Sequence, residues 1–304
     1  MQQSSILILG SCGFIGTYCC EYFTAQGYVV TGCDLIEYHT SKYNYHKASV
    51  LSFDFESMFA NNRFDVCINA SGSGNVGYSF IHPQSDFESN TLAVINVLDN
   101  IRKHQPFCRL LHISSAAVYG NPMQLPIKET AVTAPLSPYG FHKYMSEIVC
   151  KEYHAIYQIS VAIIRPFSVY GNGLTKQLLW DICQKLQQDD SIQLFGTGNE
   201  TRDFIHINDL VVLMHLLVIK GNFDGSIYNG ATGIATSIEA VARLFEKYYK
   251  GNKAIHFSGN AKVGDPANWQ ANISSVKVLG FSPAHQLEIS IQEYINWFCN
   301  NFSK

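Results

Sequence analysis

Along the first half of the chain, short runs of apolar residues alternate with stretches whose apolar residues recur at helical spacing. The predicted buried strands are 6–9, 28–33, 65–70, 109–114 and 160–164. The predicted helices between them include 17–26, 86–103 and a segment that begins near Tyr139. Apolar strands that alternate with helices predict an α/β fold, in which helices cover both faces of a doubly wound parallel sheet.

Glycine and polar residues stand where these predicted strands end. They are Gly10, Asp34, Gly72, Ser115 and Pro166. Ligands of a parallel sheet bind beyond the carboxyl ends of its strands. We therefore expect these residues to meet in one crevice.

A glycine-rich turn joins the first predicted strand to the first predicted helix, and its sequence is Gly10-Ser11-Cys12-Gly13-Phe14-Ile15-Gly16. Glycine allows a sharp turn and lets backbone N–H groups approach a pyrophosphate at the start of a helix. Asp34 ends the second strand, about 20 residues further on, where an acid can bind both ribose hydroxyls of an adenosine. This acid would repel a 2′-phosphate, and no arginine follows it closely. The pattern favours NAD over NADP, whereas a turn that serves only strand–helix packing is the alternative.

Tyr139 and Lys143 are four residues apart on a predicted helix, so they lie on the same helix face. The ammonium of Lys143 is expected to favour the phenolate and to bring the pKa of Tyr139 below its free value of about 10. Such a phenol can take a proton from an alcohol while a hydride leaves the same carbon. The pair therefore predicts catalysis of hydride transfer.

The pattern changes after Pro166, where glycine-containing loops alternate with helical pieces such as 176–188. We expect this part to form a smaller lobe that holds a substrate over the nicotinamide. The predicted cofactor-binding domain comprises 1–166 plus about 203–230, and the predicted substrate-binding lobe comprises 167–202 and 231–304.

Composition excludes several classes of protein. Hydrophobic residues make up 47% and charged residues 15% of the 304 residues, which is typical of a globular chain. The net charge of −3 gives no sign of a nucleic-acid partner, and no apolar run approaches the roughly 20 residues that span a bilayer. The nine cysteines are scattered without metal-binding spacing. We expect reduced thiols, no metal site, no signal peptide and a cytoplasmic location.

The chain resembles the extended short-chain dehydrogenase/reductases of the NAD-dependent epimerase/dehydratase family, which modify nucleotide sugars. Besides the glycine turn and Asp34, the matching motifs are Ser114-Ser115-Ala116-Ala117-Val118-Tyr119-Gly120, Ser137-Pro138-Tyr139-Gly140-x-x-Lys143, Arg165-Pro166-Phe167-Ser168-Val169-Tyr170-Gly171, Thr201-Arg202-Asp203-Phe204-Ile205-His206, and Gly264-Asp265-Pro266 followed by Trp269. Their order and spacing cover nearly the whole chain. The resemblance implies a Rossmann-type domain with a smaller C-terminal substrate-binding lobe.

The resemblance implies a catalytic trio. Tyr139 would be the general base at a sugar hydroxyl, Ser115 would hydrogen-bond the same oxygen, and Lys143 would bind the nicotinamide ribose. The implied contacts with NAD are Gly10, Gly13, Phe14, Ile15, Gly16, Asp34, Ser49, Val50, Ala70, Ser71, Gly72, Ser114, Tyr139, Lys143 and Pro166. The implied contacts with a nucleotide-diphosphate sugar are Ser79, Ser115, Ser168, Arg202, Lys262 and Trp269.

Three positions depart from the family pattern. Ser49-Val50 stands where many relatives have an aspartate that binds the adenine amine, with Asp54 as the alternative position. Ser168 stands in place of an asparagine near the sugar, and Lys262 in place of a second phosphate-binding arginine. These differences concern the choice of ligand and leave the hydride chemistry unchanged.

The residues after Ser115 narrow the expected reaction. The related 4,6-dehydratases carry Asp-Glu where this chain has Ala116-Ala117. What remains is the minimal set for moving a hydride at one carbinol, which favours a 4-epimerase of the UDP-glucose 4-epimerase type. A nucleotide-sugar 4-ketoreductase or 4-dehydrogenase is the alternative, and a non-catalytic NAD-sensing protein is a further one. The resemblance also implies a homodimer that forms through the helices at 86–103 and 139–157.

Overall fold

The computed structural model describes residues 3–48, 55–260 and 264–302. The elements of the larger part are β1 (Ser5–Leu9), α1 (Phe14–Ala25), β2 (Val29–Asp34), β3 (Asn44–Lys47), α2 (Glu56–Asn61), β4 (Val66–Asn69), α3 (Val76–Ile81), α4 (Pro83–Phe87), η1 (Glu88–Leu92), α5 (Ala93–His104), β5 (Arg109–Ile113), η2 (Ala116–Tyr119), α6 (Pro138–Tyr157), β6 (Val161–Pro166), α8 (Ile207–Lys220) and β10 (Asp224–Gly230). The strands predicted from the apolar runs are therefore confirmed within one to a few residues at each end.

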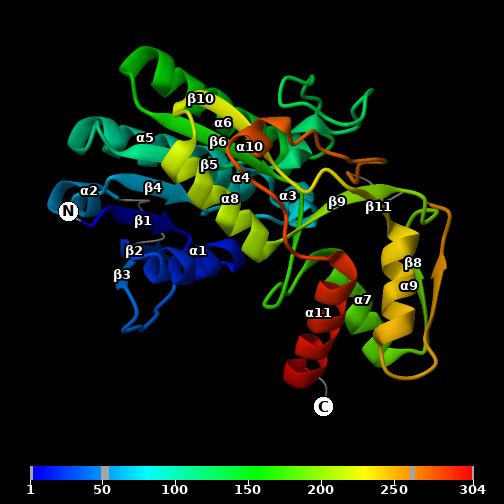
Figure 1. Cartoon of the computed structure of the whole chain (residues 1–304). Helices are drawn as coiled ribbons and strands as arrows, with labels where there is room; N and C mark the ends of the chain where they lie inside the picture. The colour runs from blue at the N-terminus through cyan, green and yellow to red at the C-terminus, as the bar shows by residue number, and fades with distance from the viewer. Residues whose placement is uncertain (1–2, 49–54, 261–263, 303–304) are drawn as a thin grey trace.

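Seven parallel strands form the main sheet, in the order β10-β6-β5-β4-β1-β2-β3. The chain winds outward in one direction from β1 and in the other from β4, so the order reverses between these two neighbours. In open parallel sheets, this reversal is where ligands bind. The predicted doubly wound fold is confirmed, and Figure 1 shows its helices on both faces of the sheet.

Alternate residues of β1 pack into two different cores. Ile6 and Ile8 join the buried side chains of α1 and α8, whereas Leu7 and Leu9 join those of α2, α5 and α6. All four are at most 1% exposed. A strand buried on both faces must be apolar at every position, which explains the continuous apolar runs in the sequence.

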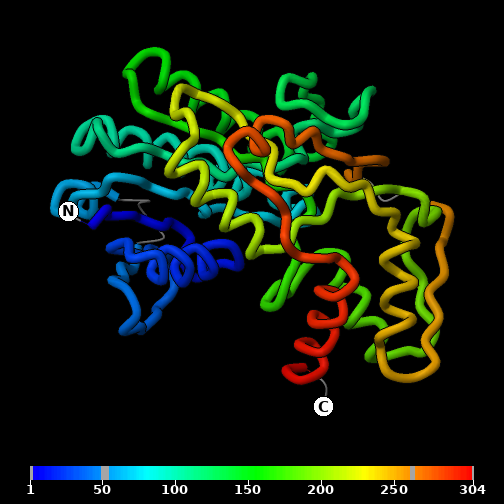
Figure 2. Tube along the Cα trace, viewed as in Figure 1, coloured from blue at the N-terminus to red at the C-terminus, as the bar shows by residue number. Residues whose placement is uncertain are grey.

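The smaller lobe contains two short sheets and a group of helices. Its elements are β7 (Ser168–Tyr170), α7 (Gln177–Gln188), β8 (Ser191–Leu194), β9 (Thr201–His206), β11 (Ala235–Ser237), α9 (Ile238–Tyr248), β12 (Ala254–Phe257), α10 (Ser274–Val278) and α11 (Leu287–Phe302). A third core joins α7, α9 and α11, which lie below and to the right of the main sheet in Figures 1 and 2. Strand β9 pairs with β7 and β11 in this lobe, while β10 joins the main sheet. The predicted domain boundaries stay a prediction.

The segment 86–103 differs from the single helix that the sequence predicted. It is divided into the end of α4, a π-helical turn at η1, and α5. The wider turn buries the side chains of Asn90 and Thr91, and the Thr91 hydroxyl donates to the His142 carbonyl of α6 at 2.9 Å. Apolar spacing does not distinguish an α-turn from a single π-turn, which is why the sequence missed the break.

Candidate active site

The start of α6 places Tyr139 and Lys143 at the carboxyl edge of the main sheet. Ser137 caps the helix, because its hydroxyl accepts a hydrogen bond from the Gly140 N–H at 3.2 Å, and Pro138 occupies the first turn. Both predicted catalytic side chains are buried, with 9% exposure for Tyr139 and 5% for Lys143. The four-residue spacing places both groups on one face of α6, and tertiary packing buries that face.

Ser115 reaches the same place from the end of β5. Its hydroxyl accepts a hydrogen bond from the Ala117 N–H at 3.1 Å and so caps the short helix η2. A hydrogen bond from Ser115 also acts to lower the pKa of Tyr139. The structure thus brings together Ser115 and Tyr139, which the sequence placed in separate motifs.

The charge state of the trio differs from the one that the sequence predicted. Burial raises the pKa of Tyr139 to about 12, despite the opposing effect of Ser115. Burial also lowers the pKa of Lys143 to about 8, and its Nζ donates to the Ile113 carbonyl at 3.0 Å. The expectation that Lys143 acidifies the phenol is wrong for the protein's own groups, because burial is the largest influence on the phenol and Lys143 is not among the groups that lower its pKa.

The glycine turn fits a dinucleotide on steric grounds. A Cβ on Gly16 would lie 1.9 Å from the Gly10 carbonyl oxygen, and one on Gly10 would lie 2.6 Å from the Ala70 carbonyl oxygen. Gly10 also has a φ of +75°, which favours glycine. Gly13 is the exposed N-cap of α1 and forms no side-chain cap, so the first N–H groups of this helix are free for an anion. Phe14 and Ile15 form the first turn of that helix.

Asp34 has the geometry of a fixed acid beside this turn. Its Oδ2 accepts a hydrogen bond from the Cys12 N–H at 2.8 Å, and its Oδ1 accepts one from the Leu35 N–H at 2.7 Å. The two nearby lysines are engaged elsewhere, since Lys42 pairs with Glu21 and Lys47 with Glu37. The carboxylate is therefore held in place by backbone groups, and both of these lysines are paired with other acids instead of being free for a 2′-phosphate.

The loop after β4 lies against the turn and against η1. Ala70 contacts Gly10 as described, and the Ser71 hydroxyl donates to the Asn69 side chain at 2.6 Å. Gly72 has a φ of +103°, and a Cβ there would lie 2.5 Å from the Asn90 Oδ1. Pro166 is buried at the end of β6, which is separated from β4 by β5. The residues of the turn and of the loop after β4 thus gather at the switch point of the sheet, and Pro166 lies two strands away from β4.

A buried network that the sequence did not reveal stands behind Ser115. The Ser114 hydroxyl donates to the Glu147 carboxylate, which also binds Arg165 through two hydrogen bonds of 2.8 and 2.6 Å. Arg165 and Glu147 are 2% and 1% exposed. Glu147 stands four residues after Lys143, so its place on the same helix face was the available signal. The network ties α6 to β5 and β6 and fixes the strand end that carries Ser115.

The substrate side is built from the smaller lobe. Arg202 lies beside the Trp269 ring, with 5.6 Å from Cζ to the ring centroid, and donates to the carbonyls of Thr201 and Ala267. The Trp269 side chain is 8% exposed, and its indole N–H donates to the Gly120 carbonyl at 3.0 Å. Trp269 therefore connects the lobe to the segment that follows Ser115.

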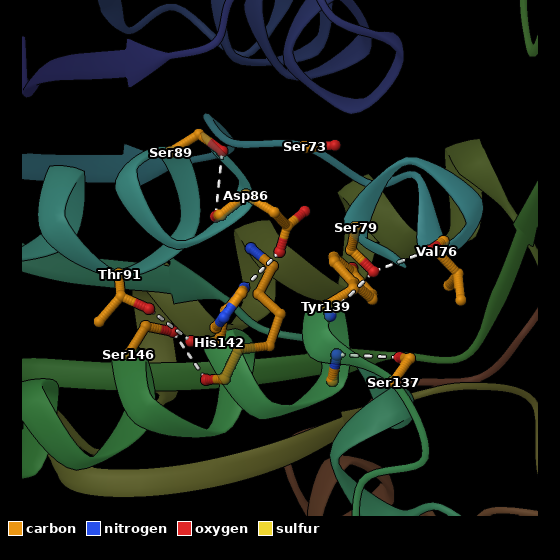
Figure 3. A network of polar contacts seen from close by, with 12 residues as sticks. Ser73, Val76, Ser79, Asp86, Ser89, Thr91, Ser137, Tyr139, His142 and Ser146 are labelled. Carbon is orange, nitrogen blue, oxygen red and sulfur yellow. Dashed lines mark hydrogen bonds and ion pairs between the residues drawn. The ribbon is translucent and has the colours of Figure 1, made fainter. Parts of the chain in front are cut away.

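Two predicted substrate residues have different surroundings. The Ser79 hydroxyl is buried, donates to the Val76 carbonyl at 2.7 Å and accepts from the Tyr139 N–H at 3.1 Å, as Figure 3 shows. It thus supports the first turn of α6, and its contact with a substrate stays a prediction. Ser168 is half-buried at the start of β7.

Lys176 is a cation near this site that sequence analysis missed. Its Nζ lies 3.0 Å from the point that a Cβ on Gly74 would occupy, in the loop after β4. Its charge also acts to lower the pKa of Lys143. No carboxylate within the described ranges lies at ion-pair distance from Lys176. It directly precedes α7 in a loop without a motif, so the sequence offered no specific signal.

The remaining predictions concern residues outside the described ranges or general properties of the chain. Ser49, Val50, the alternative Asp54, and Lys262 lie outside the described residues. All nine cysteines are free thiols, as predicted. Within residues 3–48, 55–260 and 264–302, no group of three or more metal-ligating side chains occurs. None of the helices in those ranges combines the length and apolar character needed to cross a bilayer.

A parallel sheet with this glycine turn and an acid at the end of β2 defines a dinucleotide-binding protein of the Rossmann type. Residues 6–231 match the NAD dependent epimerase/dehydratase family, and the chain belongs to this family. NAD is the cofactor of the family, in agreement with the fixed carboxylate of Asp34.

Several known proteins are similar over their whole length. A Methanocaldococcus jannaschii protein with the provisional name UDP-glucose 4-epimerase is 29% identical over 305 residues, which cover 97% of this chain and 99% of that protein. The UDP-glucuronic acid 4-epimerase of Bacillus cereus, solved with UDP-glucuronic acid and NAD, superposes with a TM-score of 0.88 at 24% identity, covering 98% and 100% of the two chains. The UDP-glucose 4-epimerase of Thermotoga maritima gives 0.87 at 21%, covering 97% and 99%. The two structures share the fold with this chain.

Proposed function

We propose that this chain is an NAD-dependent nucleotide-sugar 4-epimerase that acts through a transient 4-keto sugar. The observation that carries the proposal is the meeting of Ser115, at the start of η2, with the buried Tyr139 of α6, whose pKa Ser115 acts to lower. The next two residues, Ala116 and Ala117, offer no acid or base for the elimination of water. The names of the similar proteins, which are UDP-sugar 4-epimerases, support the same reaction.

The trio has separate tasks in this reaction. Tyr139 accepts the proton of the C4 hydroxyl, and Ser115 holds the same oxygen by a hydrogen bond. NAD⁺, when bound, would supply the hydride acceptor for C4 and would return the hydride to the opposite face of the sugar. Lys143, anchored to the Ile113 carbonyl, is placed to hold the nicotinamide ribose. Because the protein alone leaves Tyr139 with a raised pKa, proton transfer requires additional positive charge beside the phenol.

The cofactor is held mainly by backbone groups. The N–H groups at the start of α1, after Gly13, face the pyrophosphate, and Asp34 binds the adenosine ribose. The remaining proposed contacts are Gly10, Phe14, Ile15, Gly16, Ser49, Val50, Ala70, Ser71, Gly72, Ser114 and Pro166. The cofactor domain and the smaller lobe keep the bounds that the sequence predicted.

A nucleotide diphosphate sugar fits the cations of the substrate side. A guanidinium can bind phosphate oxygens in a fork, and Arg202 is held by two backbone carbonyls and the Trp269 ring. Lys176 and Lys262 add positive charge, and Ser79 and Ser168 complete the proposed contacts. The similar proteins named above point to UDP as the nucleotide.

We further propose that the protein is a homodimer in the cytoplasm. Phe141, Met145 and Ile148 are 40–49% exposed on one face of α6, and Phe87 and Leu92 are 37% and 39% exposed on the adjoining α4 and η1. Exposed apolar residues that are contiguous mark interaction surfaces. A second copy of the same helices would cover this face, and the free thiols fit a reducing compartment.

The test is incubation of the purified protein, without added cofactor, with UDP-glucose, UDP-galactose, UDP-glucuronic acid and the N-acetyl sugars. A 4-epimerase that retains NAD converts one sugar into its C4 partner, which chromatography or proton NMR detects. A 4-ketoreductase would act only on a keto sugar and would consume NADH. Absence of interconversion by a folded, NAD-loaded protein would contradict the proposal. Sedimentation analysis tests independently whether the protein is a dimer in solution.

A further inference from the structure

A buried carboxylate and an imidazole stand beside the catalytic helix turn. Asp86 of α4 is 0% exposed, and its Oδ2 lies 2.6 Å from Nδ1 of His142 on α6. His142 directly precedes Lys143. Figure 3 shows the two side chains pointing toward one another from their helices, with Tyr139 one helical turn away.

Stability alone does not explain this pair. The other carboxylate oxygen of Asp86 has no hydrogen-bond partner among the described residues, and neither do the two polar atoms of the nearby Asn90 side chain. A buried carboxylate with a single donor is poorly compensated for its loss of hydration. Apolar residues of similar size are often at least as stabilising as a buried ion pair. A poorly compensated buried charge is typical of a functional site.

Packing contacts hold Asp86 of α4 in place against His142, which lies on the helix that carries Tyr139 and Lys143. Helix α4 and the π-turn η1 pack against α6, and the Thr91 hydroxyl binds the His142 carbonyl at 2.9 Å. The His142 ring also contacts the Phe87 ring edge to face, with 5.5 Å between the ring centroids. These contacts hold His142 in one orientation, so the Asp86 carboxylate is held against the turn of α6 that carries Lys143.

The charge of Asp86 acts on both catalytic groups. After the effect of burial, Asp86 is the largest influence that raises the pKa of Lys143, and it also raises the pKa of Tyr139. Glu147 and Cys150 act on Lys143 in the same direction, whereas Lys176 opposes them. His112, behind the Lys143 turn, is buried and has a lowered pKa, so it adds no charge at neutral pH.

We propose that Asp86 and His142 are positioning residues of this active site: Asp86 keeps Lys143 cationic in its buried place, and His142 holds the Asp86 carboxylate through Nδ1. This inference deepens the proposed epimerase function for its effect on turnover, but the charge of Lys143 can be measured without any substrate. Neither residue touches the reacting atoms, so their effect passes through Lys143 and Tyr139.

The direct test is a ¹⁵N NMR titration of the lysine side chains, with the Lys143 signal identified by its loss in Lys143→Met. Removal of a nearby negative charge makes a cation less stable, so Asp86→Asn should lower the pKa of Lys143 by about 0.5 unit or more. His142→Leu should act in the same direction, because the Asp86 carboxylate loses the donor that holds it in place. His142→Asn, whose amide can replace Nδ1 as the donor, should restore the wild-type titration.

The chain contains a matched control pair. The buried carboxylate of Asp209, near the start of α8, also contacts an imidazole, that of the more exposed His285, at 2.8 Å. Asp209→Asn and His285→Leu should leave the titration of Lys143 unchanged. Melting curves of all variants verify that they are folded, and if Asp86→Asn fails to fold, the two His142 variants carry the test.

The pH profile of epimerisation gives a second readout. Loss of the Asp86 charge lowers the pKa of Lys143, which must be protonated, and that of Tyr139, which must lose its proton. Both limbs of the profile should therefore move to lower pH in Asp86→Asn, whereas a purely structural defect would lower the rate at every pH. An unchanged Lys143 titration in Asp86→Asn, or equal shifts in Asp209→Asn, would overturn the inference. A protein that epimerises no UDP-sugar but shows the Lys143 shift would contradict only the proposed function.

Discussion

The cofactor side and the substrate side of the site are constructed from different chemical groups. On the cofactor side, glycines bring backbone atoms so close that a Cβ on Gly16 would overlap the Gly10 carbonyl, and Asp34 is fixed by two backbone N–H groups. On the substrate side, the side chains of Arg202, Trp269 and Lys176 come from segments far apart in the sequence. The first surface is determined by backbone conformation and the second by individual side chains.

This difference has a consequence for substitution. On the cofactor side, where backbone atoms form the binding surface, the closest contacts tolerate only glycine. This surface binds one ligand that does not vary, which is the dinucleotide. A side-chain site can change its preferred ligand by one residue, because each cation or ring contributes separately. We therefore expect variants on the substrate side to change the Michaelis constant for the sugar, and variants on the cofactor side to change the affinity for NAD.

Tyr139 lies where the two sides meet, and Tyr139→Phe should have the largest effect on turnover of all the variants. The variant removes only the proton acceptor, so turnover should fall by at least about a thousandfold. The affinities for NAD and for the nucleotide sugar should change by less than about threefold, because the phenyl ring still fills its place. Single-turnover assays and calorimetric titrations measure these quantities. Tyr144→Phe, on the same helix, serves as the control; retained turnover in Tyr139→Phe would remove the tyrosine from the mechanism.

Arg202→Met should have the next largest effect and should concern the substrate side alone. Loss of the paired hydrogen bonds from the guanidinium to the diphosphate should raise the KM of the nucleotide sugar by about 10- to 100-fold, with a smaller change in kcat. The affinity for NAD should stay the same. Arg243→Met is the matched control, since Arg243 forms exposed ion pairs on α9 of the same lobe. If both variants raise KM equally, Arg202 does not bind the substrate.

The sequence predicted the main sheet and the cofactor side well, for physical reasons. Apolar runs and a glycine turn are local patterns, and the parallel arrangement follows from them. The contact of Asp86 with His142 could not be predicted, because the two residues are 56 positions apart and meet only where α4 packs on α6. No sequence motif marks Lys176, because its long side chain, and not a particular backbone conformation, brings the ammonium near Gly74.

The charge state of Tyr139 shows a further limit of sequence analysis. The spacing of Tyr139 and Lys143 correctly predicted their common place on α6, but the predicted direction of the pKa shift was wrong. The direction depends on the depth of burial and on the groups that act on the phenol, which are Ser115 and Asp86. Both quantities come from tertiary packing, on which the four-residue spacing gives no information.

Asp34→Ala should have a moderate effect, limited to the cofactor side. Loss of the ribose acceptor should weaken NAD binding by about tenfold and reduce the discrimination against NADP, because the charge that repels the 2′-phosphate is removed. The KM of the nucleotide sugar should stay within about twofold of wild type. Titrations with both cofactors measure the change. Glu37→Ala, which removes an exposed acid paired with Lys47, should leave both affinities unchanged; an unaltered preference in Asp34→Ala would exclude Asp34 as the ribose ligand.

Trp269→Phe should have the smallest effect and would sharpen the distinction between the two sides. The variant removes the indole N–H that binds the Gly120 carbonyl and shortens the ring beside Arg202. We expect a loss of about 1–2 kcal/mol in the free energy of unfolding and a KM of the nucleotide sugar that rises by about two- to fivefold. Trp180→Phe is the control, because Trp180 packs on Phe298 and Phe302, away from Arg202. It should lower stability without a change in KM, so an equal rise of KM in both variants would show that Trp269 acts only through the packing of the lobe.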